Sequence, residues 1–241
     1  MLALDMALIR QEIALPHADS AIGPSPIMPQ KIASYHDLVR TDALAMLTGN
    51  AGTVLDFGGG VGASSAALKQ TGSAAHVTLL DQVADKALDD VDCAITLDLN
   101  DNAQVKAVLD KYAPFDTILC LDVLEHLIDP WVTFTLLENA LKPGGTMVLS
   151  LPNANHHSVV MPLIMRGRFD YADAGVKDRT HLRWFTKATM AELATSGALI
   201  LDQISPNISG RSDNAFNAGT LRLFERFFAK QYRLKLRKPG C

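Results

Sequence analysis

Short apolar runs alternate with helix-forming segments along most of the chain, and this alternation restricts the fold more than any other feature of the sequence. The runs rich in leucine or β-branched residues are residues 53–57, 76–80, 94–97, 115–121 and 146–151. The segments with helical patterns between them are residues 63–70, 83–89, 102–112 and 131–141. Strands that alternate with helices form βαβ units, which assemble a parallel sheet with helices on both faces. The sequence therefore predicts an α/β fold.

The C-terminal part of the sequence continues this pattern. Residues 186–196 have the pattern of a helix, and residues 198–204 that of a sixth strand. Apolar and polar residues alternate strictly over residues 231–237, which is the period of a seventh strand. A further helix is predicted over residues 217–228.

The N-terminal part has a different composition. Residues 16–30 contain four prolines together with glycine and serine, which is typical of a linker. From Ser34 the pattern is helical, and Gly49 is expected to end that helix. We therefore expect residues 1–33 to be an arm and linker, and residues 34–241 to be one domain.

Composition and charge exclude several classes of protein. Hydrophobic residues make up 48% and charged residues 20% of the 241 residues, which is typical of a globular protein. The net charge is −4, and because residues 211–241 hold eight basic and two acidic residues, the preceding part is strongly acidic. An acidic body argues against a nucleic-acid backbone as the main partner.

Neither a membrane span nor a signal peptide is expected from the sequence. The three cysteines have no metal-site spacing, and no apolar run is long enough to span a membrane. The first residues lack the basic region of a signal peptide. We therefore expect a cytoplasmic protein.

The turn after the first predicted strand reads Asp56-Phe-Gly58-Gly-Gly60-Val-Gly-Ala63. Glycines there let the backbone approach a ligand closely and turn into a helix whose N-terminus faces that ligand. Gly58, Gly60 and Ala63 fit the fingerprint of dinucleotide-binding proteins. Asp56, however, would repel a pyrophosphate and would favour a cationic group such as an α-amino group or a sulfonium. A tight turn without a ligand is the third interpretation.

Acidic residues end the next two predicted strands. Asp81 follows the second strand, where a carboxylate can accept two hydrogen bonds from a ribose diol of either kind of nucleotide cofactor. Asp98 and Leu99 follow the third strand. Asp98 could also be the N-cap of the next helix.

The fourth predicted strand runs directly into Asp122, Glu125 and His126, and a Leu-Lys-Pro-Gly-Gly turn later leads into the fifth. Together with Asp56 and the glycines, this order resembles the class I S-adenosylmethionine-dependent methyltransferases over residues 53–205. The resemblance implies a Rossmann-like sheet of seven strands, mostly parallel, in which the last strand is inserted antiparallel.

The resemblance also implies S-adenosylmethionine as the cofactor. Asp98 would accept a hydrogen bond from the adenine amine, and Leu99 would pack on the ring. The whole implied cofactor-binding set is Asp56, Gly58, Gly60, Asp81, Asp98, Leu99 and Asp122.

Residues 153–186 are expected to be an insertion that covers the methyl donor and contacts the acceptor. Its last part, from Asp178 through His181 to Thr186, resembles a bacterial subgroup that is often tied to surface-glycan assembly and is similar to the ubiquinone-pathway O-methyltransferases. The resemblance implies a hydroxyl-bearing acceptor, either a sugar or a small phenol-like molecule, and a role in surface polysaccharide biosynthesis.

Methylation of a hydroxyl usually needs a base that removes its proton. The candidates are His126, His181 and Asp178, followed by His156 and His157. A lone histidine is more often structural than catalytic, so the case for His181 rests on its place in the insertion.

The segment Asp122-x-x-Glu125-His126 has a second interpretation. Ubiquinone-pathway O-methyltransferases use a similar acid-x-x-Glu-His segment to hold a divalent metal beside the substrate oxygen. The resemblance thus implies a Mg²⁺ site at Asp122, Glu125 and His126, although Asp122 is one methylene shorter than glutamate. The alternative is a capping and salt-bridge cluster at the start of a helix.

The basic residues of the C-terminal part, such as Arg226, Arg233, Lys235 and Arg237, are expected to form a solvated face. Peripheral contact with an anionic lipid or a phosphate-bearing substrate is the alternative.

Two other functions stay open. An NAD(P)-dependent oxidoreductase would explain Gly58, Gly60 and Asp81, but not Asp56 or residues 115–126. A non-catalytic module that binds S-adenosylmethionine and controls a partner glycosyltransferase is the other alternative.

Overall fold

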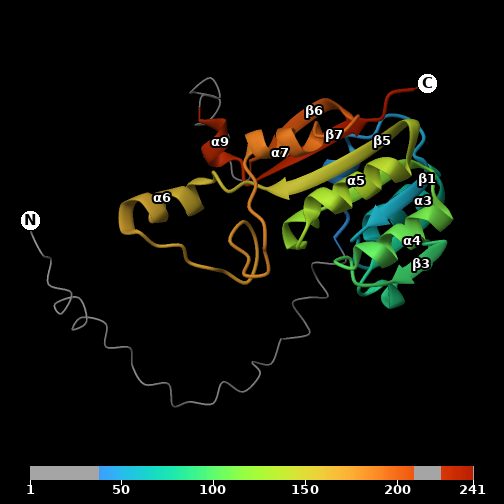
Figure 1. Cartoon of the computed structure of the whole chain (residues 1–241), viewed down its shortest axis with the longest axis horizontal. Helices are drawn as coiled ribbons and strands as arrows, with labels where there is room; N and C mark the ends of the chain where they lie inside the picture. Colours follow the sequence, from blue (N-terminus) through green and yellow to red (C-terminus); the bar gives the residue numbers. More distant parts are fainter. Residues whose placement is uncertain (1–37, 209–223, 241) are drawn as a thin grey trace, which may run out of the picture.

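The computed structural model describes residues 38–208 and 224–240, and it confirms the predicted α/β fold (Figure 1). The described strands form one sheet in the order β3-β2-β1-β4-β5-β7-β6. The strands are β1 (Gly52–Phe57), β2 (Ala74–Asp81), β3 (Cys93–Thr96), β4 (Phe115–Leu121), β5 (Leu141–Pro152), β6 (Ile200–Asn207) and β7 (Gln231–Arg237). The predicted arm and linker, residues 1–33, lie outside the described residues, as do residues 217–223 of the predicted C-terminal helix.

The strand directions confirm those expected from the resemblance to class I methyltransferases. Each neighbouring pair among β1 to β5 is parallel, because each connecting segment crosses back over the sheet. β7 lies between β5 and β6 and is antiparallel to both. The alternation of apolar and polar residues in β7 matches an alternation in burial. Tyr232, Leu234 and Leu236 are fully buried, while the residues between them are half-buried.

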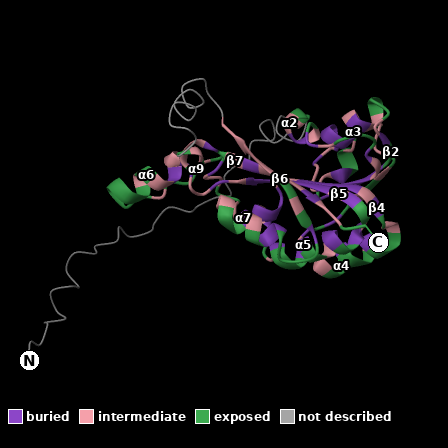
Figure 2. Cartoon of the chain, turned by 90° about the horizontal axis from the view of Figure 1, so that it is seen from above, coloured by how far each residue is buried: buried purple, intermediate pink, exposed green. Residues whose placement is uncertain are grey.

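Helices cover both faces of the sheet, as Figure 2 shows. α2 (Thr41–Leu44) and α3 (Ala63–Gln70) pack on one face, where Met46 and Leu68 join a core with Val54 and Val77. On the opposite face lie α4 (Asn102–Tyr112), α5 (Pro130–Ala140) and α7 (Lys187–Ala194). The other described α-helices are α6 (His157–Arg166) and α9 (Glu225–Phe228), and two 3₁₀ helices are η2 (Ala84–Lys86) and η3 (Leu124–His126).

Several predicted helices differ from those observed. Within the described residues, the helix expected from Ser34 to Gly49 forms only over Thr41–Leu44, the one over residues 186–196 only over Lys187–Ala194, and the one over residues 217–228 only over Glu225–Phe228. Residues 83–89 form only the short η2, because the Leu88 N–H turns back to donate to the Val61 carbonyl at 3.0 Å. The helix predicted over residues 131–141 ends one residue earlier, since Leu141 already pairs with Phe115 as the start of β5.

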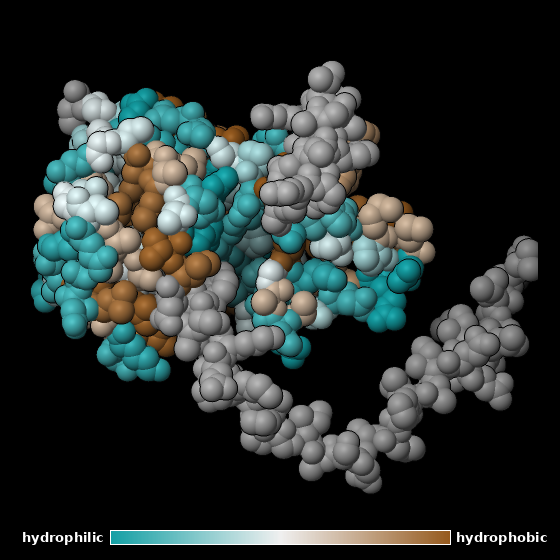
Figure 3. All heavy atoms as spheres, turned by 180° about the vertical axis from the view of Figure 1, so that it is seen from behind, coloured by the Kyte–Doolittle hydropathy of each residue, from teal (hydrophilic) through white to brown (hydrophobic). Residues whose placement is uncertain are grey.

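The predicted insertion leaves the end of β5 and contains a helix that the sequence analysis did not predict. This helix, α6, extends away from the sheet, and the chain then loops back to α7 (Figure 1). Its apolar residues reach the surface, with Ile164 74% and Met165 71% exposed. Elsewhere, on the face shown in Figure 3, apolar and hydrophilic residues are interspersed. Of the helices in the described ranges, none has the length and apolarity needed to cross a membrane.

The basic residues of β7 bind other parts of this chain. Arg233 donates to the Asp42 carbonyl at 3.0 Å, and Arg237 pairs with Asp202 at 3.1 Å. Lys238 donates to the Leu141 carbonyl at 2.7 Å, which lies just after the end of α5. The expectation of a solvated face is therefore wrong for Arg233, whose side chain is only 16% exposed, whereas the Arg237 side chain is 44% exposed and agrees with it. They fasten β7 to α2, β6 and the start of β5.

Candidate functional site

The predicted site residues that follow β1, β2, β3 and β4 lie along one edge of the sheet, because these strands are parallel and all end there. β1 leads into the glycine turn, and its neighbour β4 leads into Asp122 and η3. The two turns touch, since a Cβ built on Gly58 would lie 2.5 Å from Val123.

The glycine turn has the backbone conformation that its sequence requires. Gly58, Gly60 and Gly62 all have positive φ values, between 64° and 83°. The Asp81 carboxylate accepts a hydrogen bond from the Gly60 N–H at 2.8 Å and from the Val83 N–H at 2.9 Å. Asp81 thus ties the turn to the end of β2 and orients the loop into α3.

Gly58→Ala is expected to destabilise the protein. The new methyl group would meet Val123 at 2.5 Å, and φ is +73°, which disfavours any L side chain. Strain and overpacking together predict a loss of about 2–4 kcal/mol in the free energy of unfolding, measured by urea denaturation. Gly72→Ala is the matched control, because Gly72 has a similar φ of +72° and nothing within 4 Å of the built Cβ. An equal loss in both variants would contradict the role of packing against Val123.

Asp56 lies beneath the turn, with a relative exposure of 1%. Its carboxylate accepts a hydrogen bond from Ser65 Oγ at 2.6 Å. Burial and the nearby Asp81 charge raise the pKa of Asp56 to about 6, although the bond from Ser65 works in the opposite direction. Direct contact between Asp56 and a cofactor stays a prediction.

Asp98 and Leu99 follow β3 as predicted. The Asp98 carboxylate accepts from the Asn100 N–H at 2.9 Å, and Leu99 is buried. The interpretation of Asp98 as a helix N-cap is wrong, because Asp101 caps α4 by accepting from the Ala103 and Gln104 N–H groups. Their contacts with adenine stay a prediction.

Asp122 belongs to a polar cluster that the sequence analysis did not find. Its backbone is left-handed, with φ of 59°, and its carboxylate accepts from Ser150 Oγ at 2.8 Å. The Arg40 guanidinium and the Gln231 amide also donate to it. Arg40 is further held where its backbone N–H donates to Ser64 Oγ at 3.0 Å. Only the tertiary fold joins these residues, so no local pattern could have revealed them.

A second cluster brings together the three predicted catalytic residues. The His126 and His181 rings lie edge to face, with centroids 4.8 Å apart. His126 Nδ1 lies 3.2 Å from the Thr180 carbonyl oxygen. The Asp178 carboxylate accepts from Thr180 Oγ1 at 2.7 Å, so Asp178 reaches His126 through Thr180. By contrast, His156 is the N-cap of α6, with its ring accepting from Ser158, and His157 stacks beside it.

Glu125 is the buried member of this second cluster. Its carbonyl accepts from the Leu182 and Arg183 N–H groups at 2.8 and 2.9 Å, which joins the insertion to η3. Burial and the nearby Asp122 charge raise the pKa of Glu125 well above its usual range. Burial, followed by the charge of His126, lowers the pKa of His181. Within the described part of the chain, Glu125 Oε2 and His181 Nδ1 have no hydrogen-bond partner.

The predicted magnesium ligands do not assemble. Glu125, His126 and His181 each offer a donor atom, and these atoms lie within 4.8 Å of one another, but Asp122 is not among them. The gathered set has two imidazoles and a carboxyl group whose raised pKa favours its neutral form. Mg²⁺ prefers oxygen ligands, mostly carboxylates and water. The residues therefore do not fit Mg²⁺.

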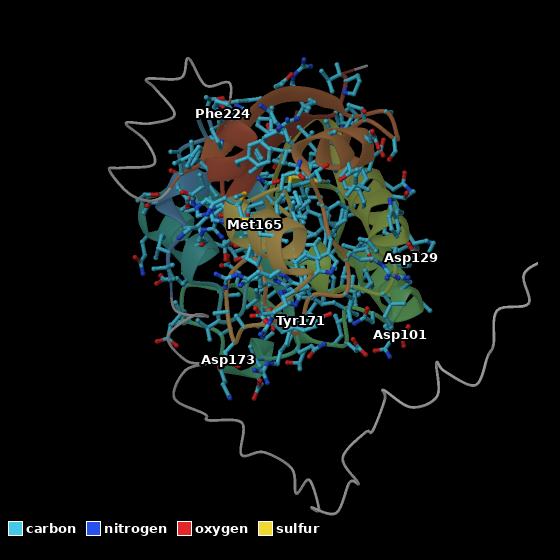
Figure 4. All side chains as sticks on the ribbon, turned by 90° about the vertical axis from the view of Figure 1, so that its left-hand side faces the viewer. Asp101, Asp129, Met165, Tyr171, Asp173 and Phe224 are labelled. Carbon is cyan, nitrogen blue, oxygen red and sulfur yellow. The ribbon has the colours of Figure 1, made fainter. Side chains whose placement is uncertain are left out.

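Aromatic side chains of the insertion line up beside His181. The Trp184 ring lies 5.6 Å from the His181 ring and 4.9 Å from Phe169, measured between centroids. Phe169 in turn lies 5.2 Å from Tyr171. Figure 4 shows Tyr171 below α6, which carries Met165. The histidines thus stand at one end of a row of aromatic rings.

Comparison with known proteins gives consistent matches. A family model described as a methyltransferase domain matches residues 29–196. A ubiquinone biosynthesis O-methyltransferase of Xylella fastidiosa is 35% identical over 133 residues, which cover 53% of this chain and 53% of that relative. A protein of the same name from Paraburkholderia xenovorans is 28% identical over 191 residues, covering 73% of this chain and 79% of the relative. The chain spans about half the length of the first of these relatives.

Solved structures show the same fold. An S-adenosylmethionine-dependent methyltransferase of Mesorhizobium loti has a TM-score of 0.53 at 16% identity, covering 82% of this chain and 96% of that one. The magnesium protoporphyrin IX methyltransferase of Synechocystis, with S-adenosylhomocysteine bound, has a TM-score of 0.53 at 17% identity. Here the match covers 87% of this chain and 82% of the other.

Proposed function

We propose, from the premise that this chain belongs to the methyltransferase domain family, that it transfers a methyl group from S-adenosylmethionine to a hydroxyl of a small acceptor. The observation that carries the proposal is the contact between two turns at one edge of the sheet. The glycine turn after β1 is suited to a nucleotide, and the turn after β4 ends in a histidine that can act as a base.

The cofactor would lie along the carboxyl edge of the sheet. Gly58 and Gly60 would let the backbone approach it, Asp81 would bind the ribose, and Asp98 with Leu99 would contact the adenine. Arg40 adds a cation that matches the carboxylate of the donor, and Asp122 holds that cation in place. Asp56 supports the turn from below and supplies negative charge near the amino or sulfonium group.

We assign proton removal to His126. The hydroxyl proton moves to the imidazole, the acceptor oxygen forms its bond to the methyl carbon, and the sulfur–carbon bond breaks to leave S-adenosylhomocysteine. Because the donor is already activated, holding the acceptor in line supplies much of the rate. Asp178 does not suit this role. Burial works to raise the pKa of Asp178, but hydrogen bonds from Thr180 outweigh that effect and lower it.

The acceptor is proposed to be a phenol-like molecule. The row of Phe169, Tyr171 and Trp184 next to His181 offers flat apolar faces, which suit an aromatic ring. The printed names of the curated relatives, ubiquinone biosynthesis O-methyltransferases, point in the same direction. The sugar acceptor and the polysaccharide pathway have no comparable support. Residues 153–186, which carry this row, are the proposed acceptor-binding unit.

Calorimetric titration with S-adenosylhomocysteine tests the cofactor assignment. We expect micromolar binding that is lost in Asp56→Ala, and no binding of reduced nicotinamide cofactor. Binding of the nicotinamide cofactor alone would instead support an oxidoreductase. Undiminished binding in Asp56→Ala would contradict the assignment of the glycine turn. Methylation of simple catechols, followed by mass spectrometry, then separates an enzyme from a module that only binds the donor.

A further inference from the structure

We propose that Thr180 is a positioning residue that fixes the tautomer of His126 and connects it to Asp178. This inference rests on the proposed function for its catalytic meaning. Thr180 belongs to the insertion, 54 residues further along the chain than His126, yet two of its oxygen atoms meet one nitrogen of the ring.

The contacts leave one arrangement of protons. His126 Nδ1 lies 3.2 Å from the Thr180 carbonyl oxygen and 3.1 Å from Thr180 Oγ1. A carbonyl oxygen only accepts, so Nδ1 must carry the hydrogen. The Thr180 hydroxyl donates its hydrogen bond to Asp178 Oδ1 at 2.7 Å, so its lone pairs can accept from Nδ1–H. Nε2 is then the unprotonated nitrogen, free to accept the proton of a hydroxyl.

The loop that carries Thr180 is fixed on both sides. Asp178 Oδ1 also accepts from the Thr180 N–H at 2.8 Å, and the Asp178 carbonyl accepts from the His181 N–H at 3.2 Å. Just beyond, the Leu182 and Arg183 N–H groups donate to the Glu125 carbonyl. Because Glu125 precedes His126, these bonds set the distance between Thr180 and the ring.

The surroundings explain why a link to Asp178 matters. Among the described residues, the ionisable groups near His126 include Glu125 on η3 and Asp178 and His181 on the insertion. When His126 takes up a proton, Asp178 is the carboxylate whose lowered pKa keeps it negative, and the Thr180 hydroxyl transmits its charge. The arrangement resembles the use of an acid to hold a catalytic imidazole in one tautomer, with a hydroxyl placed between them.

Thr180→Val tests the inference, because valine keeps the shape of threonine and removes the hydroxyl. Thr180→Ser keeps the hydroxyl, and Thr135→Val is the matched control, since Thr135 is exposed on α5 and bonds only the Trp131 carbonyl among the described residues. Long-range proton–nitrogen spectra of ¹⁵N-histidine-labelled protein report the tautomer directly. His126→Asn assigns the signals.

We expect the Nδ1–H tautomer in the wild type and in all three variants, because the Thr180 carbonyl that accepts from Nδ1–H belongs to the main chain. The Nδ1 signal should shift only in Thr180→Val, which loses the hydroxyl contact. In Thr180→Val we also expect kcat to fall on the order of tenfold, with the S-adenosylhomocysteine affinity unchanged and serine restoring kcat. An Nε2–H tautomer in the wild type, or an unchanged Nδ1 signal in Thr180→Val, would overturn the inference. The spectra need no turnover, so inactivity of all variants with the expected tautomers would remove the proposed function and leave the positioning role intact.

Discussion

His126→Asn is expected to lower kcat by roughly 100- to 1,000-fold, the usual contribution of a positioned general base. Asparagine keeps a polar group near Thr180 but cannot take up the acceptor proton. The affinity for S-adenosylhomocysteine should stay within about twofold, because His126 is not one of the proposed cofactor-binding residues. Single-turnover rates with a catechol acceptor, together with calorimetry, measure both effects.

His76→Asn is the matched control for this variant. His76 lies on β2, its side chain is 49% exposed, and its ring is 3.7 Å from Asp92. We expect full activity from it. If His126→Asn retained wild-type kcat, then base catalysis by His126 would be wrong, and His181→Asn would be the next variant to measure.

Asp56→Asn is expected to stabilise the protein at pH 8 while weakening cofactor binding. The pKa of Asp56 rises from 3.8 to about 6 on folding, so its charged form is disfavoured in the folded state. A shift of that size corresponds to about 3 kcal/mol, and asparagine, which is never charged, should recover much of it at pH 8. Urea denaturation of both proteins measures the difference.

The pH dependence gives this prediction a definite sign. Because folding raises the pKa of Asp56, the stability that its neutral form contributes is complete below pH 4. That stability is lost as the pH rises through about 6 and the carboxyl group ionises. The advantage of Asp56→Asn should therefore vanish near pH 4. Carboxylates with lowered pKa values, such as Asp116 and Asp178, behave alike in both proteins and cancel. Asp110→Asn, on the exposed face of α4, should change stability by less than about 0.5 kcal/mol at either pH. A pH-independent difference would show that burial of the Asp56 charge is not the cause.

The sequence predicted the sheet well because the strands carry strong local signals. The runs before Gly58 and Asp122 and the alternation in residues 231–237 became β1, β4 and β7. α4 matches its predicted bounds, since Asp101 and the apolar spacing mark its start and face. α6 was not predicted because residues 159–165 are apolar on all sides and contain Pro162, so they lack the pattern of a helix with one buried face.

The site was predictable only where residues are near one another in sequence. The glycine turn and the segment from Asp122 to His126 are local patterns. Arg40 and Thr180 could not be found this way, because each meets its partner across a long stretch of chain. The row of aromatic rings is likewise assembled by the folding of the insertion.

The insertion of β7 between β5 and β6 also has a consequence for biosynthesis. β6 has no strand neighbour among the described residues other than β7, which follows it in the sequence. During synthesis, β6 is therefore made before the strand with which it pairs. It takes its place in the sheet only after residues 231–237 have been made and have paired with β5. Strand pairing between distant segments is slow and leaves edges open to misassembly. Until β7 arrives, the edge of β5 that β7 will cover stays unpaired.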